Sequence, residues 1–103
     1  MRKLLLASAV VLASGLAVSG AHAANPAAGK GVYETNCAAC HGPDGVAAIP
    51  GTPNFAKRER LEKPDGQLLN SIRSGLNIMP AWQGQLNDQE MASALAYIRT
   101  LAR

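Results

Sequence analysis

The clearest pattern in the chain is a stripe of apolar residues near its C-terminal end. These residues recur every three or four positions, as on one face of an α-helix: Met91, Ala94, Leu95, Ile98 and Leu101. Asn87 and Glu90 precede the stripe with the spacing of a capping box, which satisfies backbone N–H groups at a helix start. Arg99 and Arg103 suit the negative end of the helix dipole. We therefore predict a final helix after Asn87, with Met91 in the core.

Two further helices are predicted upstream. Asn25 before Pro26 is typical of an N-cap followed by proline at the first helical position, so a helix is expected from Pro26 to about Asn36. A second helix is expected from residue 64 until Gly75 ends it. Its apolar stripe is Leu68, Leu69 and Ile72.

The segments between these helices are predicted to be loops. Residues 42–58 are rich in glycine and proline, and residues 76–85 separate the last two helices. No stretch alternates apolar and polar residues, so we expect no significant sheet. The pattern predicts one all-α domain.

The first 23 residues have the three parts of a secretory signal peptide. Arg2 and Lys3 supply the positive start, residues 4–18 the apolar run, and Ala21-His22-Ala23 the cleavage signature. We expect cleavage after Ala23 and a mature domain over residues 24–103. The alternative is an uncleaved N-terminal anchor, but the apolar run is short for a membrane span. No stable membrane insertion is expected after cleavage.

Charge and size restrict the function of this domain. The full chain carries ten basic and seven acidic residues, and removal of Arg2 and Lys3 leaves eight against seven, a net charge of +1. Without a basic cluster or interleaved aromatic residues, we expect no nucleic-acid binding. A domain of this length forms a marginal core and usually needs a cofactor or another staple.

The motif Cys37-x-x-Cys40-His41 carries the candidate chemistry. Two thiols at this spacing can reach the two vinyl groups of haem, and the histidine that follows can bind the iron, so the motif is typical of c-type haem attachment. A short disulfide and a thioredoxin-like redox pair are alternatives, although the latter belongs to a βαβ pattern that is absent here. A zinc site would need further ligands. We predict one haem c, bound covalently through Cys37 and Cys40.

A second axial ligand is expected from a methionine. His22 leaves with the signal peptide, so Met79 and Met91 are the candidates in the mature chain. Met79 precedes Pro80, which restricts it to extended conformations and can hold the thioether toward the iron. We predict His41 and Met79 as the iron ligands; the alternative is that Met79 only packs beside an open iron.

These motifs together resemble the class I cytochromes c, especially the small bacterial periplasmic forms. The matching motifs are Gly29-x-x-x-Tyr33, Cys37-Ala38-Ala39-Cys40-His41-Gly42, Gly51-Thr52-Pro53-Asn54-Phe55, Met79-Pro80-Ala81-Trp82 and Ala96-Tyr97-Ile98. The resemblance implies a cytochrome c fold with three or more helices around the haem. It implies terminal helices that cross around Gly29, Tyr33 and Tyr97. It also implies that the Pro53 carbonyl accepts a hydrogen bond from His41, and that Met79 is the sixth ligand.

The function expected from this chemistry is one-electron transfer in the periplasm, and not enzymatic catalysis. The partners would be redox proteins such as a dehydrogenase, a cytochrome complex or an oxidase. The alternatives are a dedicated haem subunit of a periplasmic dehydrogenase or terminal oxidase, and a haem enzyme or gas sensor with an open sixth site. A charged segment that follows no family motif is expected to be a solvated face: Lys57, Arg58, Glu59, Arg60, Glu62 and Lys63.

Overall fold

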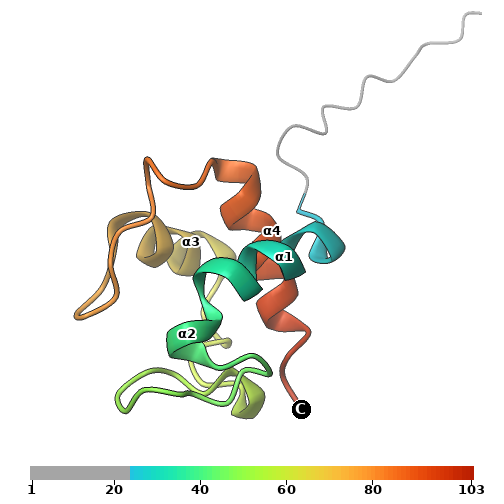
Figure 1. Cartoon of the computed structure of the whole chain (residues 1–103), viewed down its shortest axis with the longest axis vertical. Helices are drawn as coiled ribbons and strands as arrows, with labels where there is room; N and C mark the ends of the chain where they lie inside the picture. Colours follow the sequence, from blue (N-terminus) through green and yellow to red (C-terminus); the bar gives the residue numbers. More distant parts are fainter. Residues whose placement is uncertain (1–23) are drawn as a thin grey trace, which may run out of the picture.

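The computed structural model describes residues 24–103, and the predicted signal peptide lies outside the described residues. The elements are α1 (Pro26–Asn36), α2 (Ala38–His41), the 3-10 helix η2 (Phe55–Lys57), α3 (Asp65–Ser74) and α4 (Asp88–Arg99), as Figure 1 shows. The described residues contain only two isolated β-bridges, Leu76 with Met79 and Gln83 with Leu86. The predicted all-α class is therefore confirmed. None of the helices within 24–103 has the length and apolar character needed to cross a membrane.

The helix termini follow the signals in the sequence. The Asn25 side chain accepts hydrogen bonds from the second and third residues of α1. Asn87 and Glu90 form both bonds of the capping box, at 2.7 and 2.9 Å, so two N–H groups at the start of α4 are satisfied. Gly75 ends α3 with a φ of 84°, in the region that favours glycine.

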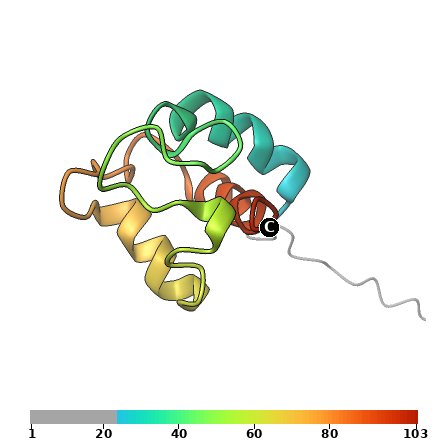
Figure 2. The same ribbon diagram turned by 90° about the horizontal axis from the view of Figure 1, so that it is seen from below.

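Helices α1 and α4 cross at close range, as the family resemblance implied (Figures 1 and 2). The crossing point is Gly29, where an added Cβ would lie 1.8 Å from the backbone oxygen of Ser93. One turn further along α1, the rings of Tyr33 and Tyr97 lie 5.4 Å apart, inclined by 54°. Only a glycine permits this approach of the two backbones.

The core combines the inner faces of these two helices with Phe55 of η2 and Leu68 of α3. Tyr33 is fully buried, Met91 is 1% exposed, and Leu95 and Ile98 are buried beside them. The prediction that Met91 belongs to the core is confirmed. Most of the core therefore lies between helices from opposite ends of the described chain.

Two details differ from the sequence-based expectation. The predicted loop over residues 42–58 contains η2, because the Asn54 side chain accepts from the Lys57 N–H and caps a single tight turn. Helix α4 ends at Arg99, so Leu101 and Arg103 lie beyond it. Arg103 approaches Asp44, at 3.9 Å, instead of a helix end.

Candidate functional site

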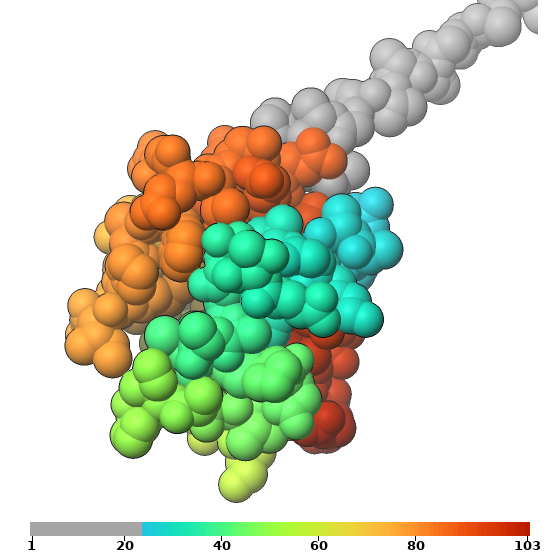
Figure 3. Space-filling view, viewed as in Figure 1, coloured from blue at the N-terminus to red at the C-terminus, as the bar shows by residue number. Residues whose placement is uncertain are grey.

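A cavity of about 340 Å³ lies between α2, the 51–55 segment, α3, the connection after α3, and α4. In the space-filling view, orange residues of the α3–α4 connection and green residues after α2 face each other across its rim (Figure 3). All five predicted site residues line it: Cys37, Cys40, His41, Pro53 and Met79. The fold thus brings together residues from three separate segments of the sequence.

The two cysteines stand where α1 passes into α2. The Cys37 N–H donates to the Tyr33 carbonyl at 2.8 Å and so ends α1, while its own carbonyl accepts from the His41 N–H at 2.9 Å and begins α2. Both cysteines are free thiols. Burial, and secondarily the neighbouring Cys40, raises the pKa of Cys37 to about 11. At neutral pH this thiol is therefore protonated.

The residue after His41 must be a glycine. Gly42 has a φ of 83°, and a Cβ on it would lie 1.9 Å from the Val46 carbonyl oxygen. The buried Tyr33 hydroxyl donates a hydrogen bond to the Gly42 carbonyl. The buried face of α1 thus fixes the peptide group that follows the candidate ligand His41.

The His41 imidazole is held in one orientation on the cavity wall. It is 8% exposed, and its ring stacks on Phe55 with 4.6 Å between centroids and 16° between planes. Burial lowers its pKa, and the Pro53 carbonyl opposes this shift only in part. His41 is therefore neutral at physiological pH, which is the form that binds a metal.

Pro53 lies near the His41 ring, but no hydrogen bond of good geometry joins the two. Its carbonyl favours the protonated imidazole, so it lies near the ring. Nδ1 is fully buried, yet it has no hydrogen bond with good distance and angle. A buried nitrogen of this kind needs a partner, and the Pro53 carbonyl is the acceptor at hand.

Met79 is presented by a tight turn after α3. Leu76 and Met79 exchange two backbone hydrogen bonds, of 3.1 and 2.9 Å, around Asn77, whose φ is 55°. The Trp82 N–H then donates to the Ile72 carbonyl at 2.9 Å and ties the connection back to α3. This places Met79, half-buried, on the cavity wall.

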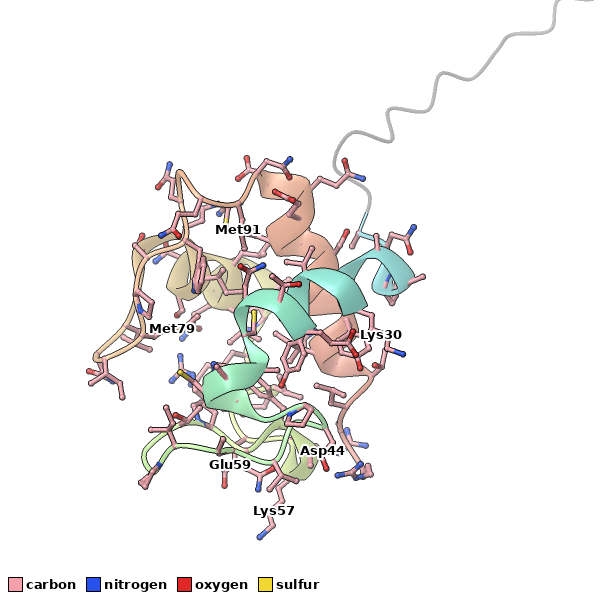
Figure 4. The ribbon with its side chains drawn as sticks, in the orientation of Figure 1. Lys30, Asp44, Lys57, Glu59, Met79 and Met91 are labelled. Carbon is pink, nitrogen blue, oxygen red and sulfur yellow. The ribbon has the colours of Figure 1, made fainter. Side chains whose placement is uncertain are left out.

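The other candidate, Met91, lies elsewhere. It belongs to α4, is almost completely buried in the core, and does not line the cavity (Figure 4). Of these two methionines, Met79 alone can reach a group inside the cavity.

One residue of the site was missed. The charged segment 57–63 was expected to be a solvated face, and this holds for its exposed members, but it is wrong for Arg60, which is half-buried and lines the cavity. Its φ of 68° turns the chain at this point. A left-handed conformation at an arginine is imposed by tertiary contacts, so no spacing rule could reveal it.

The cavity suits a flat, apolar prosthetic group bonded to two thiols. Its walls are mostly aliphatic and aromatic, and its volume is within the range of cofactor sites. It offers two free thiols, a neutral imidazole and a thioether. This donor set fits haem c.

Comparisons with known proteins agree with this geometry. Residues 24–98 match the family described as cytochrome C oxidase, cbb3-type, subunit III. The chain is 36% identical to a cytochrome c6 of Chlorolobion braunii over 73% of this chain and 89% of that protein. It is 34% identical to the cbb3-type oxidase subunit CcoP of Azospirillum sp. (strain B510), over 79% of this chain but 30% of that subunit. The solved cytochrome c6 of the diatom Phaeodactylum tricornutum superposes with a TM-score of 0.64, at 28% identity, over 76% of this chain and 94% of that one.

Proposed function

The chain belongs to the class I cytochromes c, in the group that includes cytochrome c6 and the cytochrome domain of cbb3-type oxidase subunit III, and from this membership we propose a periplasmic one-electron shuttle with His41 and Met79 as its iron ligands. It is a cytochrome c6-like electron carrier, not an enzyme, and its cofactor is haem c, bound covalently through Cys37 and Cys40. The observation that supports the ligand proposal most is the placement of Met79 and His41 on one cavity.

The bound haem supplies an iron that takes one electron from a reduced protein partner and passes it to an oxidised one. Cys37 and Cys40 hold the group in place through thioether bonds. The stacked Phe55 fixes the plane of the His41 ring, and the Pro53 carbonyl would accept a hydrogen bond from the Nδ1–H of a ligated His41, which leaves the other nitrogen free to ligate. The chain thus holds the His41 ring in an orientation from which it would ligate the iron of a bound haem.

From another part of the cavity wall, Met79 would supply a soft thioether sulfur to the iron. Met/His ligation raises the reduction potential, because the thioether favours Fe(II) over Fe(III). The aliphatic cavity walls act in the same direction, since an apolar site disfavours the additional charge of Fe(III). The chain therefore favours the reduced state through its ligand and its walls.

Ligation by both His41 and Met79 would also separate a carrier from a gas sensor or a haem enzyme. With both side chains bound to the iron, no coordination position would stay open for a small ligand. His41 is moreover the sole histidine within residues 24–103, so an acid–base histidine on the distal side is absent from that segment.

The proposed setting follows from the first 23 residues. Their charged start, apolar run and Ala21-His22-Ala23 site are those of a signal peptide, so we place the mature domain over residues 24–103 in the periplasm. N-terminal sequencing of the protein purified from its native host tests this. A mature chain that begins at residue 24 supports export and cleavage, and an intact Met1 contradicts it.

The ligand proposal is tested by two methionine variants of the holoprotein. Met79→Ala should bind carbon monoxide readily in the ferrous state and should have a lower reduction potential than the wild type, because the sixth position is open. Met91→Ala should keep the wild-type spectrum and lose about 2–5 kcal/mol of stability, since Met91 is buried in the core. Carbon monoxide binding by the wild type, or by Met91→Ala alone, would contradict the assignment.

A fixed subunit of an oxidase is the second candidate, because the matching family is named after such a subunit and CcoP is a relative. The cytochrome c6 relative, matched over 89% of its length, favours the free carrier. Purification from the native host without detergent separates the two. A stoichiometric complex would support the subunit, and an isolated chain that exchanges electrons rapidly with several partners would support the shuttle.

A further inference from the structure

Arg99 of α4 directs its whole guanidinium group at the chain that leads into α3. One terminal nitrogen donates to the Leu61 carbonyl at 2.8 Å, and the other donates to the Lys63 carbonyl at 2.9 Å. The Nε donates to the Asp65 carboxylate at 2.8 Å. All three nitrogens therefore bind residues 61–65, in the fixed fork geometry that arginine offers.

Residues 60–64, called the wall segment below, form one part of the cavity wall. Arg60 and Leu61 line the cavity. Leu61 is half-buried and packs against the core cluster of Tyr33, Phe55 and Ile98. Other members of the wall segment are exposed, so the segment separates the cavity from solvent on this side.

The remaining hydrogen bonds of the wall segment are local. The Leu61 N–H donates to the Arg58 carbonyl, and the Lys63 N–H donates to the Arg60 carbonyl, each across a single turn. Among the described residues, Arg99 alone joins this segment by hydrogen bonds to a helix distant in the sequence. The position of the wall segment against the rest of the protein therefore depends on Arg99 and on the packing of Leu61.

The backbone before and within the wall segment is in an unfavourable conformation. Arg58 and Arg60 both have a φ of 68°, in the left-handed region that residues with a Cβ seldom adopt. Such a conformation persists only where surrounding contacts impose it. The local turns alone would relax, so a distant contact is needed to hold the segment in place.

We propose that Arg99 is a positioning residue that holds the wall segment closed on the haem cavity and so excludes water from that side. This rests on the proposed function, because the quantity affected is the reduction potential of the bound haem. Water close to the iron would stabilise Fe(III), which carries the additional positive charge, more than Fe(II). The hydrogen bonds of Arg99 to the two carbonyls thereby raise the reduction potential.

Arg73 provides a matched control. It lies in the last turn of α3 and pairs with Asp88 of α4 at 3.3 Å, whereas Arg99 pairs with Asp65 at the start of α3. The two arginine side chains are almost equally exposed, at 35% and 34%. Arg73 donates to no backbone carbonyl within residues 24–103. Arg73→Gln and Arg99→Gln therefore each remove one charge and one interhelical ion pair, but only Arg99→Gln releases the wall segment.

The reduction potentials of the holoproteins at pH 7 are the first test. We expect Arg99→Gln to shift the reduction equilibrium roughly threefold further toward Fe(III) than Arg73→Gln, a difference of about 28 mV at 59 mV per tenfold change. Arg99→Lys keeps the charge, but its single ammonium group lacks the planar fork that holds two carbonyls and a carboxylate. It should therefore retain most of the shift. Equal potentials for Arg99→Gln and Arg73→Gln, or a wild-type potential for Arg99→Lys, would overturn the proposal.

Amide hydrogen exchange gives an independent readout of the opening itself. In Arg99→Gln the amides of Leu61 and Lys63 should exchange roughly tenfold faster than in the wild type, because two charge-assisted hydrogen bonds that held the segment are lost. The amide of Trp82, which donates to the Ile72 carbonyl on another wall of the cavity, should exchange at the wild-type rate. Unchanged exchange at Leu61 would show that Arg99 does not hold the segment.

Leu61→Ala keeps the proposal testable if Arg99→Gln yields no holoprotein. This variant leaves Arg99 in place but removes most of the side chain that the wall segment presents to the cavity, so it should also shift the equilibrium toward Fe(III). Combined with Arg99→Lys, it should shift the equilibrium by less than the product of the two single effects, because both changes open the same wall. A wild-type potential for Leu61→Ala would refute the exclusion of water by this segment.

An error in the ligand assignment would be distinguishable from a failure of this proposal. If Met79 were not an iron ligand, the wild type would bind carbon monoxide readily. The comparison of Arg99→Gln with Arg73→Gln does not depend on that result, because both variants keep Met79. Wild-type resistance to carbon monoxide together with equal potentials for the two variants would retain the carrier and reject the role of Arg99.

Discussion

The close approach of α1 and α4 at Gly29 leads to a prediction with a defined magnitude. In Gly29→Ala the new methyl group would lie 1.8 Å from the Ser93 oxygen and 2.3 Å from its carbonyl carbon. Ordinary contact begins near 3.4 Å, so the two backbones must separate by about 1.6 Å. Because the obstacle is backbone, no side-chain rotation can relieve it.

The separation has a cost that exceeds the gain from alanine. Overpacking of a well-packed core costs about 1–3 kcal/mol and occasionally more. Because the obstacle is rigid, the overpacking cost of Gly29→Ala should lie at the upper end of this range. The better helix propensity of alanine offsets about 1 kcal/mol of that cost. We therefore expect a net loss of about 2 kcal/mol or more, which lowers Tm by roughly 8–16 °C for a domain of this size.

Gly31→Ala is the control on the same helix. Gly31 is exposed, and nothing lies within 4 Å of the position that a methyl group would take there, so alanine should stabilise by about 0.5–1 kcal/mol. Guanidinium unfolding of the two holoproteins, followed by far-UV circular dichroism, measures both effects. If Gly29→Ala were as stable as Gly31→Ala, the reasoning from the helix crossing would be refuted.

Two further variants test the buried tyrosine and the capping box. Burial raises the pKa of the Tyr33 hydroxyl far above its ordinary value of about 10. Above pH 10 the unfolded chain therefore loses a proton that the folded chain keeps. The free energy of unfolding then falls by up to about 1.4 kcal/mol per pH unit. Tyr33→Phe should cost about 1 kcal/mol at pH 7, through the bond lost to Gly42, but should show a shallower alkaline decline in urea unfolding. The Tyr97 hydroxyl donates no hydrogen bond within residues 24–103, so Tyr97→Phe should retain the neutral-pH stability better than Tyr33→Phe. If stability declined with alkaline pH equally steeply in Tyr33→Phe and the wild type, the assignment would be contradicted. Asn87→Ala should lose about 1 kcal/mol and fray the first turn of α4, observed as faster amide exchange at Glu90; unchanged exchange there would contradict the capping role.

The fold was predictable where the signals are local. The bonds at Asn25 and Asn87 involve residues two or three positions away, so the sequence alone indicates both helix starts. The crossing at Gly29 involves Ser93, far along the chain, and it was expected only from the family resemblance. The local hydrogen bonds at the helix starts can thus be predicted directly from the sequence, whereas the long-range contact between α1 and α4 was predicted through the resemblance to a known family.

The site was predictable where its residues form a motif of fixed spacing in the sequence. The cysteines and His41 form a motif, and Met79 is marked by the proline after it. Arg60 carries no such mark, because a charge in a polar run is most often solvated. Its place on the cavity wall depends on the turn that follows it. Arg99 of α4 holds this turn by donating hydrogen bonds to the Leu61 and Lys63 carbonyls, which lie 38 and 36 positions away in the sequence.

The pairing of α1 with α4 also bears on how the chain is made. Asn25 and Ser93, which share a hydrogen bond at the start of this pair, are 68 positions apart, so a ribosome completes the first helix long before its partner exists. Until then the segment with Cys37 and Cys40 lacks the wall that α4 supplies. Pairing of the two helices is therefore a long-range step that costs more loop-closure entropy than the local turns, and it completes one wall of the cavity.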